Sequence, residues 1–150
     1  PFVEERTEAL RQFAENCEFN RVEMAEDKSL GIITSGICYQ YVRETFSEDE
    51  AKVLKIGMHN PLPDALLKDF CASVKRVVVV EELDSIIEKH CKSLGLEVEG
   101  RNLFSPIGEY SQQTVAKAFG KALPKADAPE ALPARPITCV SIANVRSFAR

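Results

Sequence analysis

The sequence predicts an α/β fold of three layers (α/β/α), in which helices cover both faces of a Rossmann-like, doubly wound, mainly parallel sheet of about five strands. Three short apolar runs are each followed by an amphipathic helical pattern, which is typical of parallel strands joined by helices. The third run contains four consecutive valines, as a central strand buried on both faces requires. With 150 residues, 45% of them hydrophobic, the chain can bury one sizeable core.

The first segment predicts an amphipathic helix over residues 2–17, with charged residues on the side away from its apolar stripe. A polar connector follows it, from Asn20 to Ser29. The residues expected to face inward from this helix are Leu10, Phe13, Ala14 and Cys17.

Three strand-and-helix units come next. Their strands are expected at residues 30–33, 53–56 and 76–80. Pro63 suits the first turn of the second helix, where its missing N–H is not needed, and Gly95 suits the C-terminal end of the third. The apolar stripes of the three helices are Ile37, Cys38, Tyr41, Val42 and Thr45; then Leu62, Leu66, Phe70 and Val74; then Leu83, Ile86, Ile87, Cys91 and Leu94.

The remainder of the chain predicts an edge strand near residues 96–98 and a last helix over 111–123. The residues of that helix expected to face the core are Val115, Ala118, Phe119 and Ala122. The chain therefore divides into an N-terminal helix and connector (1–28), an α/β domain (29–123), and a linker and tail rich in proline and alanine (124–150).

Composition excludes several functional classes. The net charge of -4 gives no general attraction to nucleic acid or to an anionic membrane, and no apolar run approaches the roughly 20 residues that span a bilayer. The five cysteines lack any C-x-x-C pair, and His90 and Cys91 are adjacent on a helix, so they face different directions. We expect reduced, buried thiols in a cytoplasmic protein without its own metal site.

Polar residues follow each of the three parallel strands. The carboxyl ends of parallel strands share one rim of a sheet, and ligands bind there. The same rim also carries Gly57 and Met58 after the second strand. The possible rim or interface residues are Thr34, Ser35, Gly36, His59, Asn60, Glu81 and Glu82.

Each rim group has two interpretations. Thr34 and Ser35 would either place an anion at a helix N-terminus or cap that helix, and capping is favoured because a single glycine is no phosphate-binding motif. His59 would either pair with one of the glutamates for acid–base chemistry or order its loop, with the glutamates bonded to neighbouring backbone or to another domain. No motif fixes a nucleophile, so no residue is assigned to catalysis, cofactor binding or metal binding.

Four blocks carry a resemblance to a known family. They are Leu-Gly-Ile-Ile-Thr-Ser-Gly-Ile-Cys-Tyr-Gln-Tyr-Val-Arg-Glu (30–44), Val-Leu-Lys-Ile-Gly-Met-His-Asn-Pro-Leu-Pro (53–63), Val-Val-Val-Val-Glu-Glu-Leu-Asp (77–84), and the stretch from Leu103 through Gly-Glu-Tyr-Ser (108–111). In order and spacing they resemble the second domain of indolepyruvate:ferredoxin oxidoreductase alpha subunits. The resemblance covers about residues 16 to 123, and the domain type is similar to the C-terminal domain of transketolase.

The resemblance implies one domain of a larger enzyme. Such enzymes oxidatively decarboxylate aryl 2-oxoacids to the acyl-CoA and pass electrons through iron–sulfur clusters to ferredoxin. It further implies that thiamine diphosphate and Mg²⁺ bind to other domains, that this domain is structural and inactive alone, and that its partners are those domains and a beta subunit. The Cys-Pro-Gly-Cys-Pro-His-Arg-like motif that follows the linker in the family is missing at residues 138–143.

Two other functions remain open at this level. One is a freestanding regulatory module that binds an anion or a nucleotide at the rim. The other is the equivalent domain of a different 2-oxoacid:ferredoxin oxidoreductase, since substrate choice lies in domains outside this segment.

Overall fold

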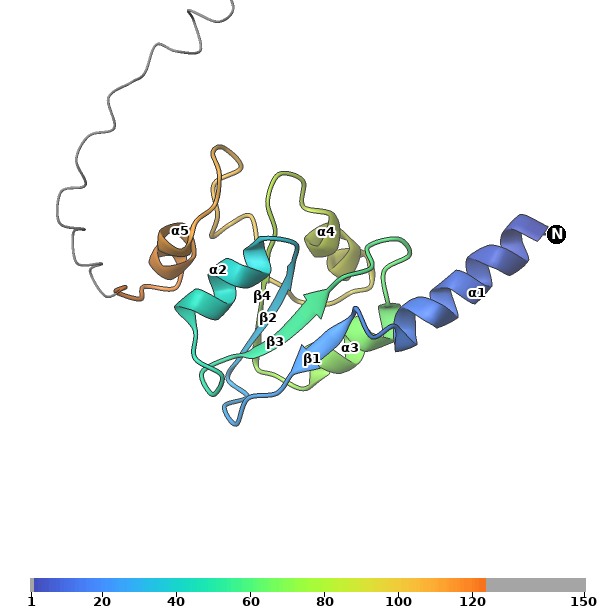
Figure 1. Ribbon diagram of the computed structural model, residues 1–150, viewed down its shortest axis with the longest axis horizontal. Coiled ribbons are helices and arrows are strands. Elements are labelled where there is room, and N and C mark those ends of the chain that lie inside the picture. Colours follow the sequence, from blue (N-terminus) through green and yellow to red (C-terminus); the bar gives the residue numbers. More distant parts are fainter. Residues whose placement is uncertain (1, 124–150) are drawn as a thin grey trace, which may run out of the picture.

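The computed structural model describes residues 2–123 (Figure 1). The predictions for residues 124–150 lie outside the described residues. They concern the linker, the missing family motif at residues 138–143, and Cys139. The elements in chain order are α1 (Phe2–Asn16), β1 (Arg21–Glu23), β2 (Leu30–Ser35), α2 (Cys38–Thr45), β3 (Lys52–Ile56), α3 (Asp64–Ala72), β4 (Arg76–Val80), α4 (Ile86–Ser93) and α5 (Gln112–Ala118).

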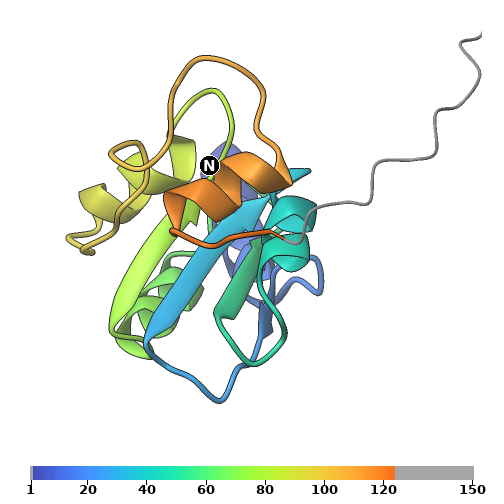
Figure 2. The same ribbon diagram turned by 90° about the vertical axis from the view of Figure 1, so that its left-hand side faces the viewer.

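The predicted α/β fold with a mainly parallel sheet is confirmed. The strands lie in the order β1-β3-β2-β4, with β2 parallel to both β3 and β4 and β1 antiparallel to β3. Helices α2 and α5 cover one face, and α3 and α4 cover the other (Figures 1 and 2). The three predicted central strands are all present, because continuous apolar runs are buried on both sides.

The number of strands differs from the prediction at both edges of the sheet. The described sheet has four strands rather than five. Strand β1 lies in the stretch predicted as a polar connector, because three residues with one valine carry no periodic pattern. The edge strand expected near 96–98 is reduced to one bridge between Glu99 and Val78, in which Val79 N–H donates to the Glu99 carbonyl (2.7 Å).

Three helix boundaries also differ. Helix α4 begins at Ile86, because Leu83 adopts a left-handed backbone conformation (φ 59°) in the preceding turn. Helix α5 ends at Ala118, before Gly120 (φ 67°), so Ala122 is exposed and does not face the core as predicted. Pro63 occupies the N-cap of α3 rather than its first turn. Gly95 follows α4 with φ 77°, as expected of a glycine after a helix end.

The core consists of two clusters, one on each face of the sheet. Between the sheet and helices α2 and α5, Val42 and Val115 pack against Ile32. Between the sheet and helices α3 and α4, Phe70 and Ile87 pack against the other face. Alternate residues of each strand enter opposite clusters, as the two-residue period of a strand requires.

Helix α1 does not bury the stripe predicted for it. Ala14 is buried, and Cys17 just beyond the helix is too, but Leu10 and Phe13 remain about half exposed. The helix extends away from the sheet and touches the body at its C-terminal end (Figure 1). Local spacing predicts which side of a helix is apolar, but it does not predict whether the rest of the described chain covers that side.

Burial should make two thiols unreactive. None of the four cysteines within residues 2–123 is in a disulfide; Cys17, Cys38 and Cys91 are buried and Cys71 is half-buried. Burial raises the pKa of Cys38 to about 11 and that of Cys91 to about 12.

We expect iodoacetamide at pH 8 to label Cys38 and Cys91 at least ~100-fold more slowly in the native chain than in the unfolded chain, because only the thiolate reacts. Peptide mass spectrometry measures the labelling of each cysteine. If Cys38 in the native chain reacted at pH 8 as fast as in the unfolded chain, the expectation would be contradicted.

No helix within the described part of the chain is long and apolar enough to cross a membrane.

Candidate functional site

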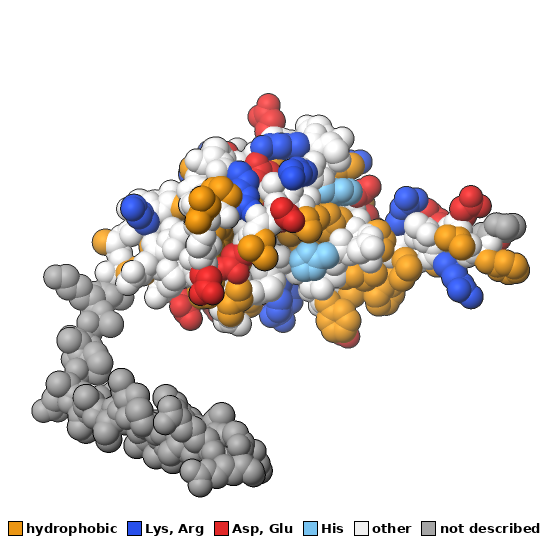
Figure 3. All heavy atoms as spheres, turned by 90° about the horizontal axis from the view of Figure 1, so that it is seen from above, with side chains coloured by type: hydrophobic (Ala, Val, Ile, Leu, Met, Phe, Trp, Pro, Cys, Tyr) orange, Lys and Arg blue, Asp and Glu red, His pale blue; other side chains and the backbone are white. Residues whose placement is uncertain are grey.

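The carboxyl ends of β2, β3 and β4 form the candidate site, seen from above in Figure 3. From β2 the chain passes first to β3 on one side and then, by way of α3, to β4 on the other. The order of strands therefore reverses between β2 and β4, and in open α/β sheets such a reversal places the ligand-binding crevice at the carboxyl ends of those strands.

Thr34 and Ser35 end β2, but neither caps the helix that follows. The Thr34 side chain is fully buried, and its hydroxyl donates to the Val80 carbonyl (3.0 Å), which ties β2 to β4. Helix α2 has Ile37 at its N-cap position and no side-chain cap. The favoured prediction that these hydroxyls cap the helix is therefore wrong. Capping requires a side chain turned towards the helix, whereas Thr34 points to the neighbouring strand.

Gly36 makes the turn between β2 and α2. Its backbone is left-handed (φ 54°), a conformation that glycine adopts without steric cost. No other atom lies within 4 Å of where a Cβ would stand, so this turn is open to its surroundings.

Glu81 follows β4 and caps α4. Its carboxylate accepts hydrogen bonds from the backbone N–H groups of Ile86 (3.1 Å), Ile87 (2.9 Å) and Glu88 (3.0 Å). The N-terminus of a helix presents unpaired N–H groups and partial positive charge, and a buried carboxylate satisfies both. Glu81 therefore has a structural role, as the second interpretation of the sequence predicts.

Glu82 is also bonded within the domain, since its carboxylate accepts from the backbone N–H of Tyr110 (2.8 Å). This bond fixes the segment that leads into α5. His59 is exposed in the loop after β3, and within residues 2–123 no hydrogen bond or ion pair joins it to Glu81 or Glu82. The acid–base pair considered from the sequence is therefore not assembled.

His59 and Asn60 instead line a pocket of about 630 Å³ beside the rim. Its apolar walls include Leu62 and Ile86. On the same wall, His90 Nε2 lies 2.6 Å from a carboxylate oxygen of Asp64, joining α4 to the start of α3. Sequence reasoning did not find this pair, because 26 residues separate its members and no motif relates them.

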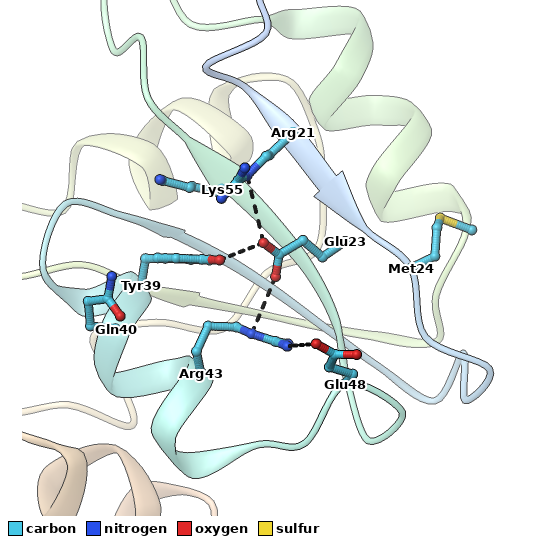
Figure 4. A pocket seen from close by; sticks show the side chains of 8 residues that line it. All are labelled: Arg21, Glu23, Met24, Tyr39, Gln40, Arg43, Glu48 and Lys55. Carbon is cyan, nitrogen blue, oxygen red and sulfur yellow. Dashed lines mark hydrogen bonds and ion pairs between the residues drawn. The ribbon is translucent and has the colours of Figure 1, made fainter.

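A second pocket, of about 670 Å³, lies between α2 and the edge of the sheet (Figure 4). Glu23 is its centre: it accepts from the Tyr39 hydroxyl (2.5 Å) and pairs with Arg43 (3.4 Å). The Glu23 carboxylate raises the pKa of Tyr39. The Lys55 ammonium lies 4.6 Å from the Tyr39 ring centroid. These residues were missed because β1, which carries Glu23, has no recognisable sequence pattern.

The described residues do not form a metal centre. Within residues 2–123 no three His, Cys, Asp or Glu side chains come together in a way that would hold an ion. Cys71 and Cys91 share one core cluster, but the described cysteines do not form the set of thiolates that an iron–sulfur cluster requires. The described side chains therefore do not fit such a group.

Known proteins resemble this chain strongly over part of their length. No family model matches. Indolepyruvate oxidoreductase subunit IorA of Thermococcus kodakarensis is 32% identical over 132 residues, covering 82% of this chain and 20% of the relative. The subunit of the same name is 34% identical in Pyrococcus abyssi (79% of this chain) and in Archaeoglobus fulgidus (82% of this chain). This chain thus spans about a fifth of the length of these curated relatives.

A solved structure shares the fold. It is a 2-oxoglutarate:ferredoxin oxidoreductase from Magnetococcus marinus with 2-oxoglutarate, coenzyme A and succinyl-CoA bound, 20% identical, with a TM-score of 0.57 over 67% of this chain and 19% of that one. The likeness shows that this chain shares its fold with a segment of that 2-oxoglutarate:ferredoxin oxidoreductase. The sequence matches show that the chain belongs to the family of indolepyruvate oxidoreductase IorA subunits.

Proposed function

We propose that this chain is a structural and assembly domain within the alpha subunit of an indolepyruvate:ferredoxin oxidoreductase, and that its rim contacts neighbouring domains or the beta subunit rather than substrate. The observation that carries the proposal is the use of both rim glutamates inside the domain. Glu81 caps α4 and Glu82 holds the segment before α5, so both carboxylates make contacts within the domain.

The whole enzyme would oxidatively decarboxylate aryl 2-oxoacids to acyl-CoA and reduce ferredoxin. Thiamine diphosphate, Mg²⁺ and the iron–sulfur clusters would bind to other parts of the enzyme, and the complex would be cytoplasmic, with no nucleic acid or membrane partner. The identity of 32–34% with IorA relatives supports indolepyruvate over other 2-oxoacids.

Substitutions of rim residues in the full oxidoreductase complex test the assembly role. We expect Ser35→Ala and His59→Gln to leave kcat with indolepyruvate within about twofold of the wild type, because neither side chain would touch a reacting atom. A loss of more than about 100-fold in either rim variant, with subunit assembly and thiamine content unchanged, would refute the assembly-only role.

Calorimetry on the 150-residue chain separates this proposal from a freestanding binding module. The chain is titrated with coenzyme A, with nucleotides and with thiamine diphosphate. The assembly role predicts no saturable heat with any of them, whereas tight binding of one would favour the module. A panel of 2-oxoacids on the intact enzyme then distinguishes indolepyruvate from the substrates of related oxidoreductases.

A further inference from the structure

Helix α1 carries an apolar face that residues 2–123 leave uncovered. Phe2, Phe13, Val3 and Leu10 fall within about 100° of one another around the helix axis, in a sector that also includes Arg6, so all four lie on one side of the helix. Their exposed fractions are 76%, 55%, 78% and 47% in that order. Hydrophobic side chains are visible along α1 and gather where it joins the body of the domain (Figure 3).

The direction of α1 is fixed by bonds at its C-terminal end. The Glu15 carboxylate accepts from the backbone N–H groups of Ala65 (2.8 Å) and Leu66 (2.9 Å), so it caps α3. The Asn20 side chain donates to the Ala14 carbonyl (2.9 Å) and accepts from the N–H groups of Gly57 and Met58. Helix α1 is therefore anchored to the ends of β3 and α3 rather than joined by a loose connector.

The free end of α1 has little to stabilise it within the domain. Its 15 residues are near the length at which an isolated helix is marginal in water, and Ala14 is the residue of the helix that is buried. A helix of this length gains most of its stability by packing an amphipathic face against something else. The exposed face is thus the part of α1 that needs a partner.

The face is large enough to dock on a partner. From their exposed fractions, the four side chains present roughly 400–500 Å² of apolar surface. A standard interface buries about 800 Å² on each partner, somewhat more than half of it non-polar, so this area is comparable with the apolar part of such an interface. A partner in the same polypeptide is favoured over a second copy, because linked segments have a high effective concentration.

We propose that α1 docks by its Phe2, Val3, Leu10 and Phe13 face onto another domain of the same alpha subunit. The surface that receives α1 is an apolar groove in the remaining four-fifths of the polypeptide, since this chain spans about 20% of the length of its relatives. The inference rests on the proposed function, because it takes the chain to be one segment of that subunit. Helix α1 then acts as a strut that sets the position of the α/β domain.

Site-specific photo-crosslinking in the full complex of alpha and beta subunits tests this docking. Phe13 is replaced by p-benzoylphenylalanine, with Leu10 as a second labelled position if the first variant does not assemble. Gln12, an exposed residue of the same helix outside the apolar face, is the matched control. We expect the probe at position 13 to crosslink to an alpha-subunit peptide outside residues 1–150, and the probe at position 12 not to. Mixing isotopically labelled and unlabelled alpha subunits separates crosslinks within one chain from crosslinks between copies.

Every other crosslink overturns the docking proposal. A crosslink to α1 of a second copy, to the beta subunit or to residues 2–123, or no crosslink at positions 13 and 10, would each do so. Backbone hydrogen exchange gives an independent measurement, in which α1 amides should exchange at least ~10-fold more slowly in the full complex than in the 150-residue chain. Turnover of the complex without the photo-crosslinking residue is measured in parallel. An active complex with a misplaced crosslink refutes only the docking, whereas a complex inactive on every 2-oxoacid refutes the proposed function.

Discussion

Replacement of Glu81 by alanine should lower the free energy of unfolding by about 2–4 kcal/mol. The Glu81 carboxylate is nearly buried and accepts from three backbone N–H groups at the start of α4. Alanine would remove the acceptor of the Ile87 and Glu88 N–H groups and the negative charge beside the positive end of the helix, whereas the Ile86 N–H also donates to the Asp84 carbonyl (2.9 Å). Urea unfolding followed by circular dichroism measures the change.

Two variants make the Glu81 result specific. Glu81→Gln keeps an acceptor oxygen but loses the charge, so it should lie between the wild type and alanine. Glu82→Ala removes one hydrogen bond, to the Tyr110 N–H, and should cost about 1 kcal/mol. If Glu81→Ala unfolds within about 0.5 kcal/mol of the wild type, the carboxylate is not a structural cap. A functional role for the Glu81 carboxylate as an acid would then have to be considered.

Replacement of Phe70 by alanine should lower the free energy of unfolding by about 3–5 kcal/mol, more than the replacement of Glu81. Phe70 is 2% exposed and fills the layer between α3 and the sheet. The space around its ring is full: a Cβ added at Gly31 on β2 would meet the ring at 3.0 Å and Val74 at 2.7 Å. A cavity left there cannot be closed by a small shift of the backbone, because the central strand and the helix are both held by other contacts.

Urea unfolding again measures the Phe70 variants. Phe70→Leu should cost less than the alanine variant, since it retains much of the buried volume. Lys68→Ala, on the exposed side of the same helix, is the matched control and should stay within about 0.5 kcal/mol of the wild type. Equal stability of the alanine and wild-type chains would mean that α3 does not pack on the sheet as described.

Local sequence patterns specify the central layers of the fold. Continuous apolar runs such as 77–80 specify strands buried on both faces, and the spacing of Val42 or Phe70 specifies the apolar sides of the helices. These patterns are local, so they can be recognised without knowing which segments meet. The four motif blocks also led to the family that the comparisons support.

Contacts between segments that are distant in the sequence determine which hydrogen bonds the polar groups of the rim make. The sequence placed Thr34, Glu81 and Glu82 at one rim, but their hydrogen-bond partners lie on Val80, on α4 and at Tyr110. A polar side chain near a strand end has several partners within reach, and local spacing does not distinguish them.

The same limit applies to β1 and α1. Strand β1 exists because Val22 and its neighbours pair with β3, thirty or more positions further along the chain. The apolar side of α1 could be predicted from spacing, but its exposure could not, because burial depends on what else is folded around the helix. Periodicity encodes what a segment can bury, whereas contacts between distant segments decide what it does bury.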